Sequence, residues 1–177
     1  MMPAMSTTSR LLPACAALLL GACAGYSPGP TLRVGADAQE ATRSMGPPTG
    51  RHALPQGGTR LEFARGPFGK HTYMVDVDAQ GRVLGWQQVL DEAHFNAVPP
   101  GISAAELRLR LGRPSDVRSG GWQGGEVWSY RYDAIFCQWW QASVIDGRVR
   151  DTAYAPDPLC EVNDRDDFLS LGGRHRR

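Results

Sequence analysis

The chain has 177 residues, a length that fits one domain or two small ones. Its formal net charge is +1, with 19 Lys and Arg residues against 18 Asp and Glu residues. This balance excludes the strongly basic character of many nucleic-acid-binding proteins, so we expect no nucleic-acid partner on charge alone.

The amino-terminal residues are typical of a bacterial export signal. Arg10 precedes an apolar run, Leu11 to Leu20, which is too short to span a bilayer but suits a signal peptide starting at Met1 or Met5. The run ends in Leu20-Gly21-Ala22-Cys23, which looks like the lipobox of bacterial lipoproteins. This resemblance implies that residues 1–22 are removed and that Cys23 is acylated. The alternative is an ordinary secretory signal in which the cysteine is accidental.

The residue after the cysteine predicts the destination of such a lipoprotein. In Gram-negative lipoproteins, an aspartate at this place is the usual signal for inner-membrane retention, and here the residue is Ala24. The resemblance therefore implies a lipid anchor on the periplasmic face of the outer membrane. Several acyl chains, at about 0.8 kcal/mol per buried methylene, anchor a protein stably. Residues 23–31 would form a lipidated tether.

Residues 32–90 are interpreted as a first folded module. Asp37–Met45 is predicted to form a helix that begins at a capping box and ends at Gly46 and Pro48. Three strands are expected after it, at Leu61–Arg65, His71–Val77 and Val83–Val89. Apolar and polar residues alternate in His71–Val77, which favours an antiparallel sheet with one covered side.

Residues 91–160 are interpreted as a second module, followed by a polar tail over residues 161–177. Asp91 is expected to cap a short helix, and Ser103 to cap a second helix that ends at Gly112. Asp146-Gly147 is a strong signal for a two-residue hairpin turn. The three strands of this module are predicted at Val127–Tyr132, Phe136–Ile145 and Val149–Ala155.

The two modules share the residues that begin and end a helix, at a constant offset of 66 positions. This repetition indicates a tandem duplication. The matched positions are Gly35 and Gly101, Asp37 and Ser103, Glu40 and Glu106, Gly46 and Gly112, and Pro48 and Pro114. The tripeptide Gly-Arg-Val also recurs, at residues 81–83 and 147–149.

Two cysteines remain in the mature chain once Cys23 carries lipid and Cys15 is lost with the signal peptide. We predict that Cys137 and Cys160 form a disulfide, since a pair of cysteines in an exported protein meets an oxidising compartment. With the hairpin centred on Asp146-Gly147, Cys137 should face Pro156, and a turn should bring Cys160 back over it. The alternative is two buried free thiols.

The segment from Leu90 to Val149 resembles the SmpA/OmlA family, also called BamE-like, of small outer-membrane lipoproteins. The resemblance is carried by Leu90-Asp91-Glu92, Gly101-Ile102-Ser103, Leu111-Gly112-Arg113-Pro114, Trp128-Ser129-Tyr130 and Asp146-Gly147-Arg148-Val149. It implies an α+β fold of two tandem BamE-like modules, each with one or two short helices on a three-stranded antiparallel sheet. Members of the family usually have one module, and no partner-binding motif can be transferred to this chain.

The sequence gives no pattern that predicts an enzyme, a cofactor or a metal site. The four histidines have no metal-ligand spacing, and a calcium-loop-like start at Asp76 has Gln87 where the loop requires glutamate. Trp139 and Trp140 are candidate residues for a protein contact, because aromatic residues dominate interface hot spots. The alternative is that both fill the core.

These observations lead to one functional hypothesis and one rival. We expect a non-enzymatic accessory or adaptor in outer-membrane assembly or envelope integrity. Its expected partner is an envelope protein, and the β-barrel assembly machinery is the candidate. The rival is a periplasmic inhibitor or sensor that resembles the β-lactamase inhibitor protein, in which tandem modules of this shape grip an enzyme.

Overall fold

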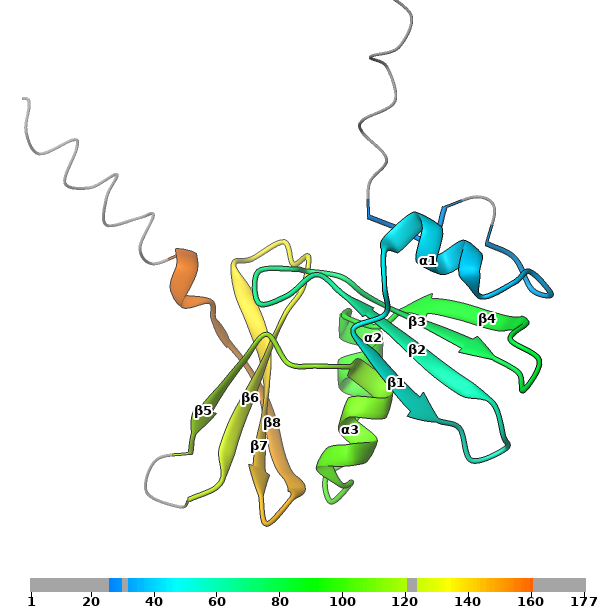
Figure 1. The fold of residues 1–177 in the computed structure, drawn as a ribbon. Coiled ribbons are helices and arrows are strands. Elements are labelled where there is room, and N and C mark those ends of the chain that lie inside the picture. The colour runs from blue at the N-terminus through cyan, green and yellow to red at the C-terminus, as the bar shows by residue number, and fades with distance from the viewer. Residues whose placement is uncertain (1–25, 30–31, 121–123, 161–177) are drawn as a thin grey trace, which may run out of the picture.

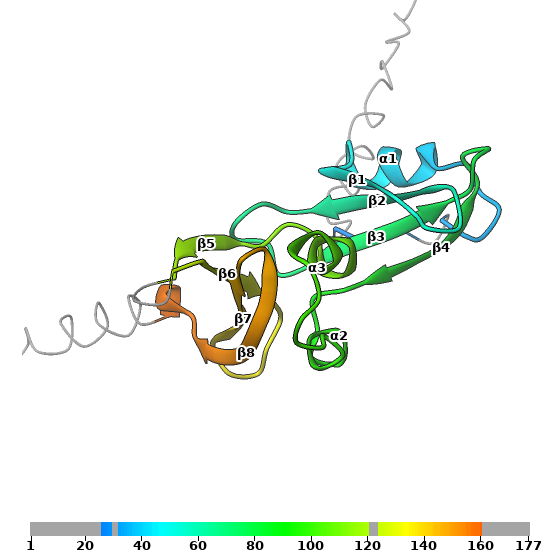
Figure 2. The same cartoon turned by 90° about the horizontal axis from the view of Figure 1, so that it is seen from below.

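The computed structural model describes residues 26–29, 32–120 and 124–160, and shows an α+β fold arranged in layers. Helix α1 covers one sheet, helices α2 and α3 follow, and a second sheet lies beyond them (Figures 1 and 2). The helices are α1 (Gln39–Met45), α2 (Glu92–Asn96) and α3 (Ala104–Leu111). The first sheet contains β1 (Gly50–Ala53), β2 (Thr59–Ala64), β3 (Thr72–Val77) and β4 (Val83–Gln88), and the second contains β5 (Asp116–Ser119), β6 (Glu126–Arg131), β7 (Gln138–Ile145) and β8 (Arg148–Pro156).

Each sheet has four antiparallel strands in sequence order, so the prediction of three strands per module was wrong. The missing strand is the first of each sheet, β1 or β5, and each has only four residues. Neither strand contributes a buried residue, and each has only one neighbouring strand. Such short edge strands carry no apolar alternation, which is the signal from which strands are predicted.

The internal repeat extends to individual hydrogen bonds. Gly35 N donates to Val83 O at 2.8 Å, and Gly101 N, 66 residues later, donates to Val149 O at 2.7 Å. Isolated bridges pair Asp37 with Arg82 and Ser103 with Arg148 at the same offset. The glycines that end α1 and α3, Gly46 and Gly112, both have positive φ angles, of 84° and 79°. Equivalent contacts at equivalent positions confirm that the fold repeats once.

A β-bulge also recurs, and it corrects the predicted strand register. In the first sheet the bulge lies at Leu84, and in the second it lies at Arg150, 66 residues later. The extra residue shifts the pairing beyond it by one position, so Pro156 faces Gln138 rather than Cys137. A turn signal predicts pairing only next to the hairpin, because a bulge farther along the strand changes the register.

The first core lies between α1 and one face of the first sheet. Ala41 and Met45 from α1 pack onto apolar side chains of β2, β3 and β4. The buried strand residues of this cluster are Leu61, Phe63, Val75, Val77 and Val83. The alternation predicted for His71–Val77 places Tyr73, Val75 and Val77 on this face of β3.

The second core lies between α2, α3 and the second sheet, and is rich in aromatic side chains. Phe95 of α2 stacks on Trp140 at 5.0 Å between ring centroids and meets Tyr132 edge-on at 5.1 Å. Leu107 and Leu111, on one face of α3, are buried in the same cluster. Asp91 and Ser103 cap the two helices as predicted, accepting hydrogen bonds from His94 N and Glu106 N.

The other face of the first sheet is covered by the end of α3, which joins the two modules. Arg60 on β2 forms an ion pair with Asp76 on β3, and its Nη1 donates to Leu109 O at 2.9 Å. The last carbonyls of a helix have no partner within the helix, so this arginine satisfies one of them. Met74, from the same face of β3, belongs to the second core. The alternation in sequence predicted that one face of this sheet is covered. In the structure, both faces of the first sheet are covered.

Candidate functional site

Several of the predicted site residues lie outside the described part of the chain, and two form a disulfide. Cys23, the signal peptide and the polar tail are outside the described residues. Cys137 and Cys160 are disulfide-bonded, with their Cα atoms 6.2 Å apart. A turn returns the chain as expected, since Asp157 N donates to Cys137 O and Cys160 N donates to Asp157 O. A loop of this length is expected to contribute about 3 kcal/mol in the chain-entropy account.

Trp139 and Trp140, the candidate contact residues, point to opposite faces of β7 and are both buried. Trp140 is 1% exposed and lies in the second core. Trp139 is 3% exposed, and the guanidinium groups of Arg131 and Arg118 lie 5.0 and 5.7 Å from its ring. In this structure neither ring is open to a partner protein, because each is covered on its own side of the sheet.

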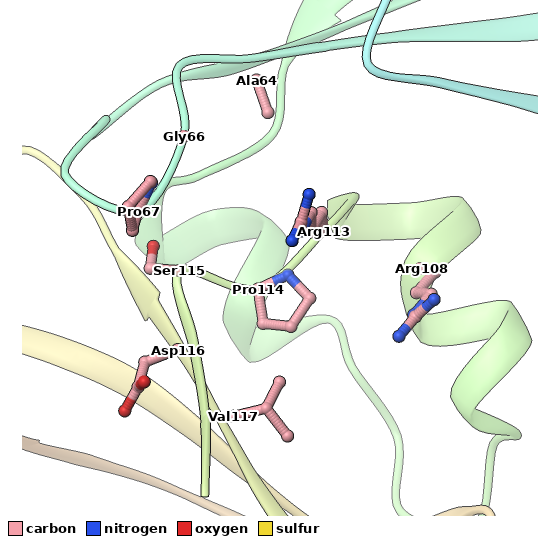
Figure 3. Close-up of a pocket in the computed structure, with 9 residues that line it drawn as sticks. All are labelled: Ala64, Gly66, Pro67, Arg108, Arg113, Pro114, Ser115, Asp116 and Val117. Atoms are coloured by element: carbon pink, nitrogen blue, oxygen red, sulfur yellow. The ribbon is translucent and has the colours of Figure 1, made fainter.

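A hollow between the two modules is the strongest candidate for a binding site. Two pockets, of about 380 and 400 Å³, lie beside the end of α3 and share Arg108 and Arg113 as lining residues. The first is also lined by Ala64, Gly66, Pro67, Pro114, Ser115, Asp116 and Val117, and the second by Thr49, Gly50, Arg51, His52 and Glu62. We call this pair of pockets the junction groove. Figure 3 shows the first pocket, with Arg108 and Arg113 on the side of α3 and Pro67 on the opposite loop.

Glu62 lines the junction groove and is 3% exposed, and its hydrogen bonds hold the surrounding segments in place. Its carboxylate accepts hydrogen bonds from Arg113 N at 2.9 Å, from His52 Nε2 at 2.9 Å and from Thr49 Oγ1 at 3.4 Å. A buried carboxylate is tolerated only where such donors replace its water. These bonds join β1, β2 and the end of α3, so the groove has a fixed base.

The wall of the junction groove is positively charged. Arg51, Arg108 and Arg113 have exposed side chains, and none of the ion pairs found within the described part of the chain involves them. The two acidic lining residues are already engaged, Glu62 as above and Asp116 by Arg118 at 2.7 Å. Arg108 is held over the Trp128 ring at 4.8 Å, which limits its motion. Among the described residues, the groove therefore offers three guanidinium groups that form no ion pair, beside two carboxylates that already have hydrogen-bond partners.

Chemically, this arrangement suits binding of an acidic group. A guanidinium presents a planar fork of N–H donors that matches a carboxylate or phosphate. Pockets of about 400 Å³ are in the range that holds a small ligand or a few residues of a peptide. The sequence analysis did not predict this site. Single arginines on a helix and a loop are usually solvated surface residues, and nothing in the sequence shows that these lie together.

The histidines and carboxylates of the described residues do not gather into a metal site. No group of three His, Cys, Asp or Glu side chains there is placed to hold a metal ion. His52 pairs with Glu62, and His94 Nδ1 pairs with Asp91 at 2.8 Å, so each has a structural partner. The bonds from His94 outweigh the effect of burial and lower the pKa of Asp91. Among the described helices, none has the length and apolar character needed to cross a membrane.

Comparisons with known proteins do not assign the chain to a family. No family model and no curated protein matches it. Among solved structures, it is similar to a cysteine-rich secretory protein from Staphylococcus aureus and to an extracellular protein containing an SCP domain from Bacillus anthracis. The identities are 12% and 10%, over 71% and 72% of this chain, with a TM-score of 0.28 for each. The chain spans 44% and 45% of those proteins, and a likeness this weak carries no argument.

Proposed function

We propose that this protein is a lipid-anchored, non-enzymatic adaptor on the periplasmic face of the outer membrane, built from two BamE-like modules. Its junction groove would hold an acidic segment of an envelope protein. The observation that carries the adaptor role is the set of three groove arginines, Arg51, Arg108 and Arg113, which form no ion pair with any residue that the structure describes. The anchor is supported by the lipobox-like residues 20–23, and the exported location by the Cys137–Cys160 disulfide.

Processing of the precursor tests the lipid anchor. In cells treated with globomycin, which blocks cleavage of lipoprotein signals, we expect the protein to accumulate as an unprocessed precursor. In a separate test, replacing Cys23 with alanine should prevent labelling of the protein with radioactive palmitate, because the acylated residue is then absent. Gel mobility and palmitate incorporation measure both effects. Normal processing in the presence of globomycin would contradict the lipoprotein assignment.

Capture of partners from crosslinked envelopes tests the adaptor role. The double variant Arg108→Glu/Arg113→Glu should lose the crosslinked partner, because it places two carboxylates where an acidic segment would bind. The control Arg33→Glu/Arg150→Glu makes the same change in net charge at two exposed arginines outside the groove, and should keep the partner. Mass spectrometry of the captured proteins gives the readout.

The identity of the captured proteins separates the two functional hypotheses. Components of the β-barrel assembly machinery would support the adaptor role. A single soluble enzyme would support the rival, a periplasmic inhibitor. Equal loss of the partner in the groove variant and the control would show that net charge, and not the junction groove, governs binding.

A further inference from the structure

Three large apolar side chains are exposed on two loops that meet where the two modules come together. Phe68, between β2 and β3, is 70% exposed. Ile135 and Phe136, between β6 and β7, are 98% and 75% exposed. Exposed apolar residues gathered on loops of a soluble domain are unusual enough to mark a contact site. We call these three residues the apolar tip.

The two loops are held together although they belong to different modules. Arg131, at the end of β6, donates from Nη1 to Pro67 O at 2.6 Å, and its guanidinium lies 5.8 Å from the Phe68 ring. Lys70 and Asp133 form a further ion pair between the loops at 3.8 Å. In Figure 1 the two loops lie next to each other above the second sheet, on the side that faces the first sheet. The apolar tip is therefore one surface with contributions from both modules.

The described chain also begins beside the first of these loops. Tyr26 lies beneath the guanidinium of Arg65, which is 4.6 Å from its ring centroid, and 6.0 Å from the ring of Tyr73. Arg65 and Tyr73 flank the loop that carries Phe68. Cys23 precedes Tyr26 by three residues, and three residues span at most about 11 Å. A lipid on Cys23 would thus hold this end of the first sheet close to the bilayer.

We propose that the apolar tip inserts into the phospholipid interface next to the lipid anchor and sets the orientation of the protein on the membrane. This inference rests on the proposed lipid anchor. Phe68, Ile135 and Phe136 would enter the boundary between headgroups and acyl chains, as the apolar faces of interfacial proteins do. Arg65, on the same loop segment, would face anionic headgroups. Since both modules contribute, insertion would hold the junction groove at a fixed height above the bilayer.

Depth-dependent quenching of an added tryptophan tests the proposal. Ile135→Trp places a probe at the most exposed residue of the tip, where the substitution should not disturb folding. Leu84→Trp is the control, because Leu84 is also exposed but lies next to the β3–β4 hairpin, at the opposite end of the first sheet. The lipidated mature proteins would be reconstituted into phosphatidylethanolamine–phosphatidylglycerol vesicles with and without brominated acyl chains. Wild-type protein gives the background from the native tryptophans.

We expect the Ile135→Trp protein to lose more emission in brominated vesicles than wild type, and the Leu84→Trp protein to match wild type. Flotation of the vesicles reports the lipid anchor separately. Protein that floats with the vesicles but shows equal quenching at positions 135 and 84 would overturn the insertion and leave the anchor intact, as expected if the tip contacts a partner protein instead. Protein that fails to float would overturn the anchor, and the insertion with it.

Discussion

Replacing Arg131 with methionine is expected to lower the free energy of unfolding by about 3–5 kcal/mol, because it leaves a buried carboxylate without its counter-charge. Arg131 and Asp157 are 8% and 7% exposed, and Nε of Arg131 donates to Oδ2 of Asp157 at 2.6 Å. The same guanidinium also satisfies Pro67 O in the other module. Chemical denaturation of the purified mature protein, followed by circular dichroism, measures the loss.

Two further variants show whether the effect comes from the buried pair. Arg118→Met is the matched control, since Arg118 also lies against Trp139 but forms an exposed pair with Asp116, a kind of pair that typically contributes about 0–1 kcal/mol. The double variant Arg131→Met/Asp157→Leu should regain much of the lost stability, because both charges are then absent. A single Arg131→Met variant as stable as wild type would contradict the structural importance of this pair.

The features predicted correctly from the sequence are those that depend on local chemistry. Ser103 caps α3 and Gly112 ends it, because capping needs only a side-chain oxygen and a residue that tolerates positive φ. The 66-residue offset predicted the repeat, since both copies use a glycine with positive φ after the helix, although Ala38, at the N-cap of α1, lacks the side-chain cap that Ser103 gives α3. The disulfide between Cys137 and Cys160 followed from counting the cysteines left in the mature chain.

The features that sequence reasoning missed depend on packing between distant segments. Nothing near Glu62 indicates that its carboxylate accepts a hydrogen bond from Arg113 N, 51 residues later. Likewise, Arg60 reads as a solvated strand residue, although it bonds the end of α3. The junction groove exists only because α3 lies on the first sheet, so its arginines carry no local signal. The bulges at Leu84 and Arg150 were missed because the pattern of side chains around them stays strand-like.

Replacing Gly112 with alanine tests how closely the two modules fit together, and the repeat supplies its own control at Gly46. Both glycines end a helix in the extended positive-φ region that is essentially restricted to glycine, with ψ of −172° at Gly46 and −161° at Gly112, so alanine at either position costs about 1–3 kcal/mol of backbone strain. An added Cβ at Gly46 meets nothing within 4 Å, whereas at Gly112 it would lie 3.0 Å from Glu62 Cδ, 3.0 Å from Thr72 Cγ2 and 3.1 Å from Met74 Cε. Crowding in a packed interior adds about 1–3 kcal/mol.

We therefore expect Gly112→Ala to lower the free energy of unfolding by about 2–6 kcal/mol, and Gly46→Ala by about 1–3 kcal/mol. The carbonyl of Gly112 also accepts a hydrogen bond from the Tyr130 hydroxyl at 3.2 Å. Burial raises the pKa of Tyr130 far above its ordinary value, so the hydroxyl keeps its proton and remains a donor. Any shift of Gly112 away from Glu62 would strain this bond within the second core. Denaturation midpoints of the two variants measured side by side give the comparison, and equal losses would show that the contact between α3 and the first sheet can relax without cost.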